Sequence, residues 1–334
     1  MTVRVGVVGI GMIGSDHIDR LARRVVGSRV SAVFDVVTDR ATQIAATVGA
    51  VVHPTALDVI NDLDVDAVVI ASPGDVHAEQ VLACISAGKP VLCEKPLATT
   101  TIDCMRVIEA EAAAGIRLVQ VGFMRRYDGA FLDVKAAIDD GSIGEPLLAH
   151  AIHRNPRAPD SFVGEMPLTD SLVHEFDIIR WLFGHEIVAT TVVSTRRSPL
   201  STEPLRDPQI VLLELANGSV VTVESFVNCQ YGYDVRCEVV GSLGTVILDT
   251  PRTVVTVSNG RRSEPVPPNW RVRFEQAYVD ELQSWVDGLA AGTVSGPSAW
   301  DGYAATAVAQ SAVTSHTRGE RTTVNLATRP ELYR

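Results

Sequence analysis

A strand, a glycine-rich turn and a helix open the sequence, and they constrain its fold more than any other feature. Residues 4–8 form a largely β-branched run that leads directly into Gly9-Ile10-Gly11-Met12-Ile13-Gly14. In a G-x-G-x-x-G turn, the first glycine permits a tight turn, the second lets the backbone approach a pyrophosphate, and the third lets helix and strand pack closely. Unpaired N–H groups at the start of the helix then bind the phosphates. The pattern predicts a dinucleotide site formed by Gly9, Gly11, Met12, Ile13 and Gly14.

The acidic residue that such a site requires comes at the end of the next strand. Residues 30–34 are apolar or small and end at Asp35. A carboxylate at this position hydrogen-bonds the hydroxyls of the adenosine ribose and repels a 2′-phosphate. Asp35 could instead be a turn residue at a strand end, but the glycine turn before it favours the cofactor role. We therefore expect NAD rather than NADP as the cofactor.

Strand and helix patterns alternate through the first third of the chain. Apolar runs typical of strands cover residues 50–53, 67–71, 91–93 and 117–121, and helical patterns cover 77–87 and 102–114. Strands that alternate with helices form a doubly wound parallel sheet of the α/β class. We predict a Rossmann domain over residues 1–122.

The pattern changes after Gly122. Alternating apolar and polar residues, separated by turn signals such as Asn217-Gly218, predict an α+β domain over residues 123–334 with a mostly antiparallel sheet. Its predicted strands are residues 147–153, 187–195, 210–215, 219–227, 235–240 and 245–248. An apolar helical stripe, which we expect to pack on this sheet, contains Phe274, Tyr278, Leu282, Trp285 and Leu289.

Charged residues follow the predicted strand 91–93, at the edge where open α/β sheets bind ligands. Glu94, Lys95 and Pro96 come directly after it, and Lys95 is one of three lysines among 29 basic residues. Unlike an arginine, a lysine can be tuned toward neutrality in a buried site. The rarity could be a compositional accident, but the position at a strand end favours a chemical role. The Lys95–Pro96 bond is a candidate for the cis form, because the chain must turn sharply there.

The preceding strand end belongs to the same edge. It carries Ser72-Pro73, and His77 follows a few residues later. We place Ser72, Pro73, His77, Glu94 and Lys95 in the cofactor site. For His77, an exposed position at the start of a helix is the alternative, and the sequence does not decide between the two.

Asp170 and His174 lie four residues apart in an apolar stretch. On an α-helix they share one face, where a carboxylate can fix the tautomer of an imidazole and raise its basicity, as a general base requires. A surface pair worth only about 0.2–0.5 kcal/mol has the same spacing. A third possibility is a divalent metal bound by His153, Asp170 and His174, although no ligand motif such as H-E-x-x-H is present.

Composition excludes several classes of function. A formal charge of −11 leaves no basic stripe for nucleic acid. Five cysteines without a C-x-x-C pair are typical of reduced thiols in a cytoplasmic protein. No apolar run approaches the roughly 20 residues that a membrane helix needs. We expect a small-molecule partner, and neither nucleic acid nor a membrane.

The chain resembles the Gfo/Idh/MocA family of nicotinamide-dependent sugar and polyol oxidoreductases. The resemblance covers nearly the whole chain, and its later segments are most similar to the inositol branch of the family. It implies that His174 is the base, that Lys95 and Asp170 complete the catalytic set, and that the polyol is surrounded by Arg125, His153, Asn155 and Tyr233. It also suggests a homotetramer built face to face. The segments that carry the resemblance are residues 9–14, Asp35, 87–96, 122–128, 151–156, 228–234, 295–303, and Asp170 with His174.

The resemblance implies NAD-dependent oxidation of one secondary alcohol of a cyclic polyol, with myo-inositol giving 2-keto-myo-inositol (scyllo-inosose) as the expected reaction. A dehydrogenase of another inositol isomer or of a pyranose sugar has no residue against it. A non-catalytic dinucleotide-binding regulator of the same fold is the alternative from another class. Loss of Lys95, Asp170 or His174 would indicate that regulator, and all three are present.

Overall fold

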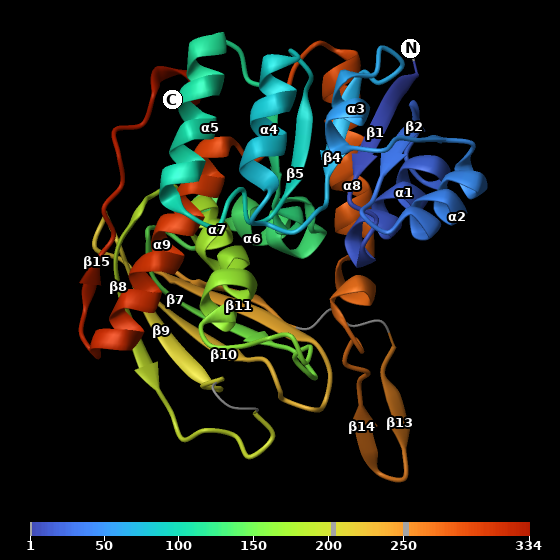
Figure 1. Cartoon of the computed structure of the whole chain (residues 1–334). Coiled ribbons are helices and arrows are strands. Elements are labelled where there is room, and N and C mark those ends of the chain that lie inside the picture. The colour runs from blue at the N-terminus through green and yellow to red at the C-terminus, as the bar shows by residue number, and fades with distance from the viewer. Residues whose placement is uncertain (1, 202–204, 250–253) are drawn as a thin grey trace. The chain divides into compact units, whose positions relative to one another are not determined.

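The computed structural model describes residues 2–201, 205–249 and 254–334, and these form two compact units (Figure 1). The first unit contains residues 1–124, 276–306 and 327–334. The second contains residues 125–275 and 307–326. Both units are therefore discontinuous in sequence.

A six-stranded parallel sheet forms the centre of the first unit. Its order is β3-β2-β1-β4-β5-β6, so the strand order reverses between β1 and β4, where doubly wound sheets bind their ligands. This confirms the predicted doubly wound α/β architecture. The strands are β1 (Val3–Val8), β2 (Ser28–Phe34), β3 (Val51–Val52), β4 (Ala67–Ile70), β5 (Val91–Glu94) and β6 (Val119–Gly122).

Local sequence explains where the helices of this unit begin and end. Thr55 and Thr100 cap two helices by accepting N–H groups three residues ahead, each at 3.1 Å. Gly115 ends another with a φ of 70°. The first helix has no side-chain cap at its N-cap, Gly11, and two other helices of the unit, with N-caps Val37 and Val76, also lack one. The helices are α1 (Met12–Arg23), α2 (Thr38–Val48), α3 (Ala56–Asn61), α4 (His77–Ser86) and α5 (Thr101–Ala114).

The long helix α8 (Trp270–Ala290) is interrupted at Phe274, whose φ of −115° and ψ of 17° are not helical. After this kink, Leu282 and Trp285 join the apolar core that contains Val5 and Val30 of the parallel sheet. The prediction that this stripe packs on the antiparallel sheet is therefore wrong. An amphipathic stripe shows that one side of a helix must be covered, but it does not show which sheet covers it.

A seven-stranded mixed sheet forms the centre of the second unit, in the order β12-β11-β7-β10-β9-β8-β15. Only β7 and β10 run parallel among its paired strands in the described residues, so the predicted antiparallel character is confirmed. The strands are β7 (Pro146–Arg154), β8 (Ile187–Ser194), β9 (Gln209–Leu215), β10 (Val220–Phe226), β11 (Asp234–Gly241), β12 (Thr245–Leu248) and β15 (Thr322–Thr323). The helices are α6 (Gly129–Asp139), α7 (Val173–Phe183) and the second half of α9 (Ala299–Arg318).

The two faces of the mixed sheet differ in burial. On one face Ala151, Leu213 and Val223 are buried, and Thr190 hydrogen-bonds Ser311 of α9 at 2.9 Å. The opposite face leaves apolar residues on four neighbouring strands exposed. These residues are Leu148, Val193, Ile210 and Val220.

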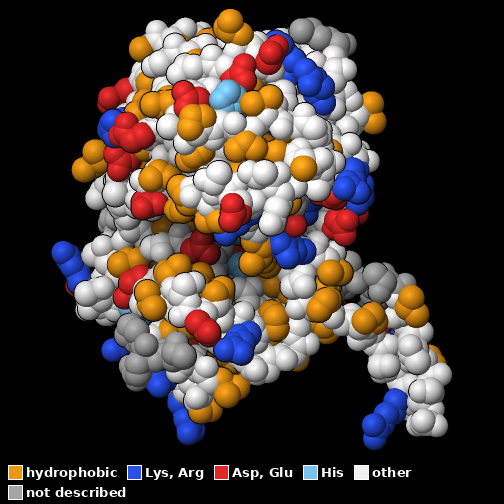
Figure 2. All heavy atoms as spheres, turned by 45° about the vertical axis from the view of Figure 1, so that its right-hand side comes forward, with side chains coloured by type: hydrophobic (Ala, Val, Ile, Leu, Met, Phe, Trp, Pro, Cys, Tyr) orange, Lys and Arg blue, Asp and Glu red, His pale blue; other side chains and the backbone are white. Residues whose placement is uncertain are grey.

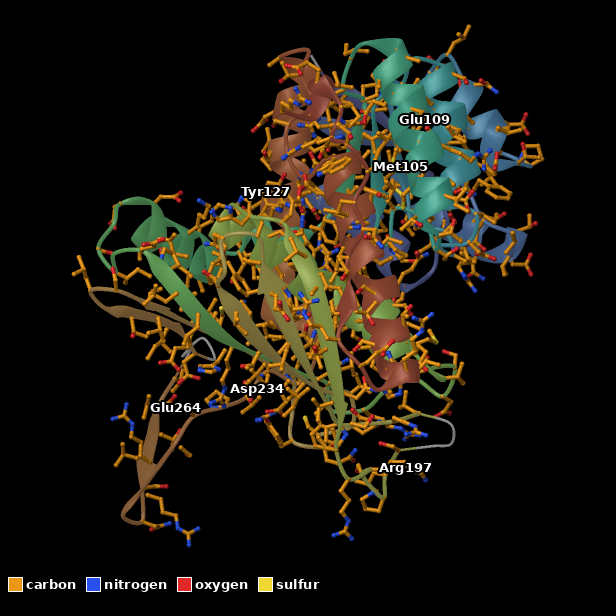
Figure 3. All side chains as sticks on the ribbon, turned by 90° about the vertical axis from the view of Figure 1, so that its left-hand side faces the viewer. Met105, Glu109, Tyr127, Arg197, Asp234 and Glu264 are labelled. Carbon is orange, nitrogen blue, oxygen red and sulfur yellow. The ribbon has the colours of Figure 1, made fainter. Side chains whose placement is uncertain are left out.

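A two-stranded hairpin, β13 (Thr256–Ser258) and β14 (Arg261–Ser263), extends from the second unit with every strand residue exposed. Asn259 and Gly260 turn it with positive φ values of 51° and 70°, as a tight hairpin turn requires. Figure 3 shows Glu264 just beyond this hairpin and Asp234 at the start of β11.

Charged and apolar side chains are mixed on the molecular surface. Figure 2 shows Lys and Arg side chains scattered among acidic and hydrophobic ones on one face. Among the helices in the described ranges, none is long and apolar enough to cross a membrane.

Candidate active site

The glycine-rich turn between β1 and α1 is closely packed on one side and open on the other. A Cβ on Gly14 would lie 2.0 Å from the Gly9 carbonyl oxygen, and one on Gly9 would lie 2.5 Å from the Ser72 nitrogen. A Cβ on Gly11 would meet nothing within 4 Å. The third glycine therefore allows the close packing of strand and helix, and the second leaves space for a ligand beside the backbone. With no side-chain cap on α1, the helix terminus can receive phosphate oxygens.

Asp35, just after the end of β2, faces this turn. Its Oδ2 accepts the Ile10 N–H at 2.7 Å and its Oδ1 accepts the Val37 N–H at 2.7 Å. Each carboxylate oxygen can accept a second hydrogen bond, which suits the two hydroxyls of a ribose. Arg40, which the sequence did not single out, places its Nη1 3.5 Å from Asp35 Oδ2. The pair thus puts a cation next to the carboxylate that the sequence predicts to repel a 2′-phosphate.

His77 connects two loops at the carboxyl ends of β4 and β5. The ring is 1% exposed, its Nε2 lies 2.8 Å from the Ser72 carbonyl oxygen, and its Nδ1 lies 2.8 Å from the Pro96 carbonyl oxygen. Burial lowers the pKa of His77, although the contacts with the Pro96 and Ser72 carbonyl oxygens oppose the shift; a neutral ring can donate to only one of these two oxygens. The alternative of an exposed histidine is wrong, because the ring is enclosed between these loops. With neither ring nitrogen left for a ligand, the predicted cofactor contact becomes a support of the loops that carry Ser72 and Pro96.

Glu94 points into the protein and not toward a ligand. Its Oε1 lies 2.7 Å from Nε2 of His17 on α1, and its Oε2 accepts the Lys95 N–H at 3.2 Å. Burial opposes ionisation, but the hydrogen bond and charge of His17 and the charge of Lys95 hold the pKa of Glu94 below its ordinary value. Glu94 therefore fixes the backbone from which Lys95 extends, and a direct cofactor contact through its carboxylate is not supported. The Lys95–Pro96 bond is cis, as predicted.

A buried ionic cluster joins three elements of the second unit. Arg125 Nη1 is hydrogen-bonded to Glu175 Oε1, and the other oxygen, Oε2, lies 2.8 Å from His153 Nδ1. Tyr233 packs edge-on against the His153 ring, with 5.7 Å between the ring centroids. The centroid of the Phe274 ring lies 5.5 Å from the Arg125 guanidinium carbon. The structure thus brings together Arg125, His153 and Tyr233, which the family resemblance placed around the polyol.

Asn155 follows this cluster at the end of β7. Its N–H donates to the Phe226 carbonyl oxygen at 2.9 Å, and its own carbonyl oxygen accepts the Cys229 N–H at 2.9 Å. Both hydrogen bonds fix the backbone of Asn155, and with it the position from which the side chain extends.

Asp170 and His174 do not lie on one regular α-helix, so the predicted helix type is wrong at Asp170. Asp170 lies in a π-helical turn, Pro167–Ser171, and His174 lies in the first turn of α7. The turn is closed by the Leu172 N–H, which donates to the Pro167 carbonyl oxygen at 3.0 Å. A π-turn contains one more residue than an α-turn and is often found at functional sites. The side chain of His174 is largely buried, and that of Asp170 is half-buried.

Sequence reasoning missed four residues that support these sites: His17, Arg40, Glu175 and Phe274. Two had a visible signal. His17 lies three residues after Gly14 and one residue before the apolar Ile18, on the buried face of α1. Glu175 directly follows the proposed base, in a helix whose other residues are largely apolar. Their partners lie 77 and 50 residues away in the chain, so only the fold identifies them.

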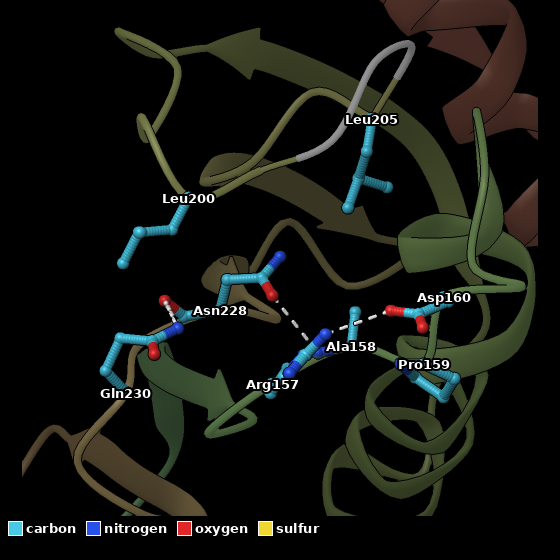
Figure 4. A pocket seen from close by; sticks show the side chains of 8 residues that line it. All are labelled: Arg157, Ala158, Pro159, Asp160, Leu200, Leu205, Asn228 and Gln230. Carbon is cyan, nitrogen blue, oxygen red and sulfur yellow. Dashed lines mark hydrogen bonds and ion pairs between the residues drawn. The ribbon is translucent and has the colours of Figure 1, made fainter.

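A cavity of about 220 Å³ in the second unit is separate from these residues (Figure 4). It is lined by Arg157, Ala158, Pro159, Asp160, Leu200, Leu205, Asn228 and Gln230. No predicted site residue lines it. Among the described residues, no cluster of His, Cys, Asp and Glu is arranged to hold a metal ion.

Comparisons with known proteins cover the whole chain. Residues 3–123 match the NAD-binding Rossmann domain of the Gfo/Idh/MocA oxidoreductase family, and residues 135–326 match its C-terminal α/β domain. Inositol 2-dehydrogenase 3 of Saccharopolyspora erythraea is 52% identical over 100% of this chain and 98% of its own. Inositol 2-dehydrogenase of Ralstonia nicotianae is 47% identical over 100% of both.

Solved structures give the same result. Myo-inositol dehydrogenase from Lactobacillus casei, in complex with NAD(H) and myo-inositol, is 37% identical over 100% of both chains, with a TM-score of 0.97. Scyllo-inositol dehydrogenase from the same organism, with NAD(H) and scyllo-inositol, is 25% identical over 97% of this chain and 99% of its own, with a TM-score of 0.90. The glycine turn, the strand-end lysine and these matches lead to one conclusion: the chain belongs to the Gfo/Idh/MocA family of NAD-binding oxidoreductases.

Proposed function

We propose that this protein is an NAD-dependent inositol dehydrogenase that oxidises the 2-hydroxyl of myo-inositol to the ketone of 2-keto-myo-inositol. The observation that carries the proposal is the similarity over the whole chain, at a TM-score of 0.97, to an enzyme solved with NAD(H) and myo-inositol. The open glycine turn and Asp35 fit the adenosine and pyrophosphate parts of NAD. The buried polar cluster of the second unit suits a ligand made of hydroxyl groups.

In the proposed reaction, His174 takes the proton of the reacting hydroxyl while the carbon loses its hydride. Bound NAD supplies the hydride acceptor. Asp170 orients His174 and stabilises the imidazolium, and Lys95 holds the reacting oxygen with its ammonium group. The hydrogen bond from the Lys95 N–H to Glu94 supports this role, because it fixes the backbone next to the amine.

The remaining hydroxyls need donors and acceptors that distinguish them. We assign this task to Arg125, His153, Asn155 and Tyr233. Arg125 and His153 are held in place by Glu175, and Tyr233 packs against His153. Groups fixed in this way discriminate by position, because a misplaced hydroxyl leaves a buried polar atom unpaired.

The test is the initial rate of NADH formation with a panel of inositol isomers and aldoses. We expect the highest kcat/KM with myo-inositol and the ketone at carbon 2 of the product. A higher kcat/KM with scyllo-inositol would overturn the assignment in favour of the isomer that the other Lactobacillus casei enzyme binds. NAD binding without reduction by any polyol would point to a regulator.

We further propose that the enzyme acts in the cytoplasm, in inositol catabolism, as a homotetramer. The exposed apolar residues on one face of the mixed sheet support association through that face. The five cysteines are free, as expected in a reducing compartment. Light scattering during size-exclusion chromatography gives the mass directly, and Val220→Arg on the open face should lower it.

A further inference from the structure

Glu175 occupies a position that the catalytic proposal does not explain. It follows His174 directly on α7, so its side chain leaves the helix in a different direction from the proposed base. It is 1% exposed, and its two carboxylate oxygens are divided between two partners. Oε1 accepts from Arg125 Nη1, and Oε2 lies 2.8 Å from His153 Nδ1.

The chemistry of these three groups determines where the proton of His153 lies. A guanidinium only donates hydrogen bonds, and an ionised carboxylate only accepts them. Arg125 Nη2 lies 3.3 Å from the same His153 Nδ1, so Nδ1 cannot serve both neighbours. The shorter contact is with Glu175, which requires a hydrogen on Nδ1.

Glu175 is ionised, which this arrangement requires. Burial raises its pKa, but the charge of Arg125 and the hydrogen bonds of Arg125 and His153 outweigh that effect and hold the pKa below its ordinary value. The charges of Arg125 and Glu175 cancel, so a neutral imidazole leaves the cluster neutral. A neutral imidazole that carries its hydrogen on Nδ1 has a bare lone pair on Nε2.

We propose that Glu175 is a positioning residue that keeps His153 in the Nδ1–H tautomer, so that Nε2 accepts the hydrogen of one polyol hydroxyl. This inference rests on the proposed function, in which His153 contacts the polyol. Among the described residues, none hydrogen-bonds to Nε2. Arg125 can only donate, so a polyol hydroxyl that donates beside it needs a neighbouring acceptor, and Nε2 of His153 can be one.

Glu175→Gln tests the tautomer with almost no change in volume. The amide oxygen must face Arg125, because an amide NH₂ there would oppose a guanidinium. The NH₂ group is then directed at His153 Nδ1, which must accept, and the ring hydrogen moves to Nε2. The substitution therefore reverses the hydrogen-bonding role of Nε2.

Deoxyfluoro-inositols detect this reversal, because organic fluorine accepts hydrogen bonds weakly and never donates them. At one ring position of the inositol, fluorine should lower kcat/KM of the wild type by about tenfold or more, the cost of one unpaired buried acceptor. In Glu175→Gln the penalty at that position should largely disappear, while KM for NAD stays unchanged. Equal penalties in the two proteins at every position would overturn the proposal.

A disrupted fold would not change the effect of fluorine at one ring position alone. Two further variants separate a disrupted fold from a changed tautomer of His153. Glu175→Asp keeps an acceptor facing Nδ1 and should restore the wild-type fluorine pattern. Glu186→Gln removes a carboxylate that pairs with Arg180, the last-turn arginine of the same helix, at 2.5 Å, and it should leave the pattern unchanged. If Glu186→Gln alters the pattern as Glu175→Gln does, the proposal fails.

The tautomer can also be measured in the wild type without activity or variants of Glu175. Long-range ¹H–¹⁵N spectra of histidine-labelled protein, assigned with His153→Gln, distinguish Nδ1–H from Nε2–H. An Nδ1–H ring supports the proposal even if inositols prove not to be the substrate. An Nε2–H ring overturns it even if they are.

Discussion

In the described residues, each unit has a histidine–glutamate pair with both side chains buried, and the two pairs differ in what else holds the carboxylate. In the first unit, Glu94 has His17 at 2.7 Å and, through its other oxygen, the backbone N–H of Lys95. In the second unit, Glu175 has His153 at 2.8 Å and the guanidinium of Arg125. Glu94 thus depends on a histidine for its side-chain partner, whereas Glu175 has a cation that never loses its charge.

The difference matches the tasks that we assign to the two units. A carboxylate with a permanent cation beside it stays ionised whatever the histidine does, so its histidine can be committed to a ligand. A carboxylate with only a titratable partner couples its own ionisation to that partner. The permanent cation beside Glu175, in the second unit, suits recognition of a polyol. The titratable partner of Glu94, in the first unit, suits the support of Lys95.

The largest effect should come from removing the base of the second unit. We expect His174→Ala to lower kcat by about a thousandfold, the usual size of general-base catalysis. NAD affinity should stay within a few-fold of the wild type, because the glycine turn and Asp35 belong to the other unit. Steady-state kinetics and fluorescence titration with NAD measure the two quantities. Loss of NAD binding in this variant would contradict the division of tasks.

The next largest effect concerns the residue that Glu94 supports. Lys95→Arg keeps the charge but replaces a compact ammonium with a planar guanidinium. If the ammonium must lie on the reacting oxygen, kcat should fall by about a hundredfold, as for a misplacement of about 1 Å at the reacting centre. The comparison is with Lys95→Ala at saturating NAD. An arginine variant that kept more than about a third of wild-type kcat would rule out the catalytic role.

Removing each histidine in turn tests the comparison of the two pairs directly. In the folded protein the pKa values of Glu94 and Glu175 are lowered. Both carboxylates therefore stabilise the folded state at a pH above the unfolded pKa of about 4.3. This stabilisation is lost as the pH falls through the folded pKa. Without His17, burial dominates for Glu94 and its pKa rises. His17→Ala should therefore cost about 3 kcal/mol at pH 8 and less at pH 5.5, where Glu94 can bind a proton.

His153→Ala is the matched control, because Arg125 still neutralises Glu175. Its cost should be the same at the two pH values. Urea unfolding followed by fluorescence gives both sets of free energies. A cost of His17→Ala that does not vary with pH would show that Glu94 does not depend on His17 for its charge.

The smallest effect should be on the choice of cofactor. Asp35→Ser removes the repulsion of a 2′-phosphate and leaves Arg40 nearby, so the ratio of kcat/KM for NAD to that for NADP should fall by about tenfold or more. Adding Arg40→Ala to Asp35→Ser should remove most of the gain with NADP. Equal kcat/KM for the two cofactors in the wild type would refute the role of Asp35.

Features that depend on neighbouring residues could be predicted from the sequence. The glycine turn, Asp35 and the strand runs follow from local spacing. The structure confirms the turn and the two sheets, and it places Asp35 against the turn. The pairs of Glu94 and Glu175 could not be found in this way, because their partners come from distant segments. The π-turn at Asp170 could not be predicted either, because one extra residue in a turn leaves the spacing of apolar residues in the sequence nearly unchanged.

The kink at Phe274 has a consequence for biosynthesis. The part of α8 beyond it supplies Leu282 and Trp285 to the core around β1 and β2, and Tyr333 hydrogen-bonds Glu111 of α5. During translation, the core of the first unit therefore cannot be completed until segments more than 150 residues after its last strand, β6, have been synthesised. Until then its apolar surface needs protection, and we expect a fragment ending at residue 124 to aggregate when expressed alone.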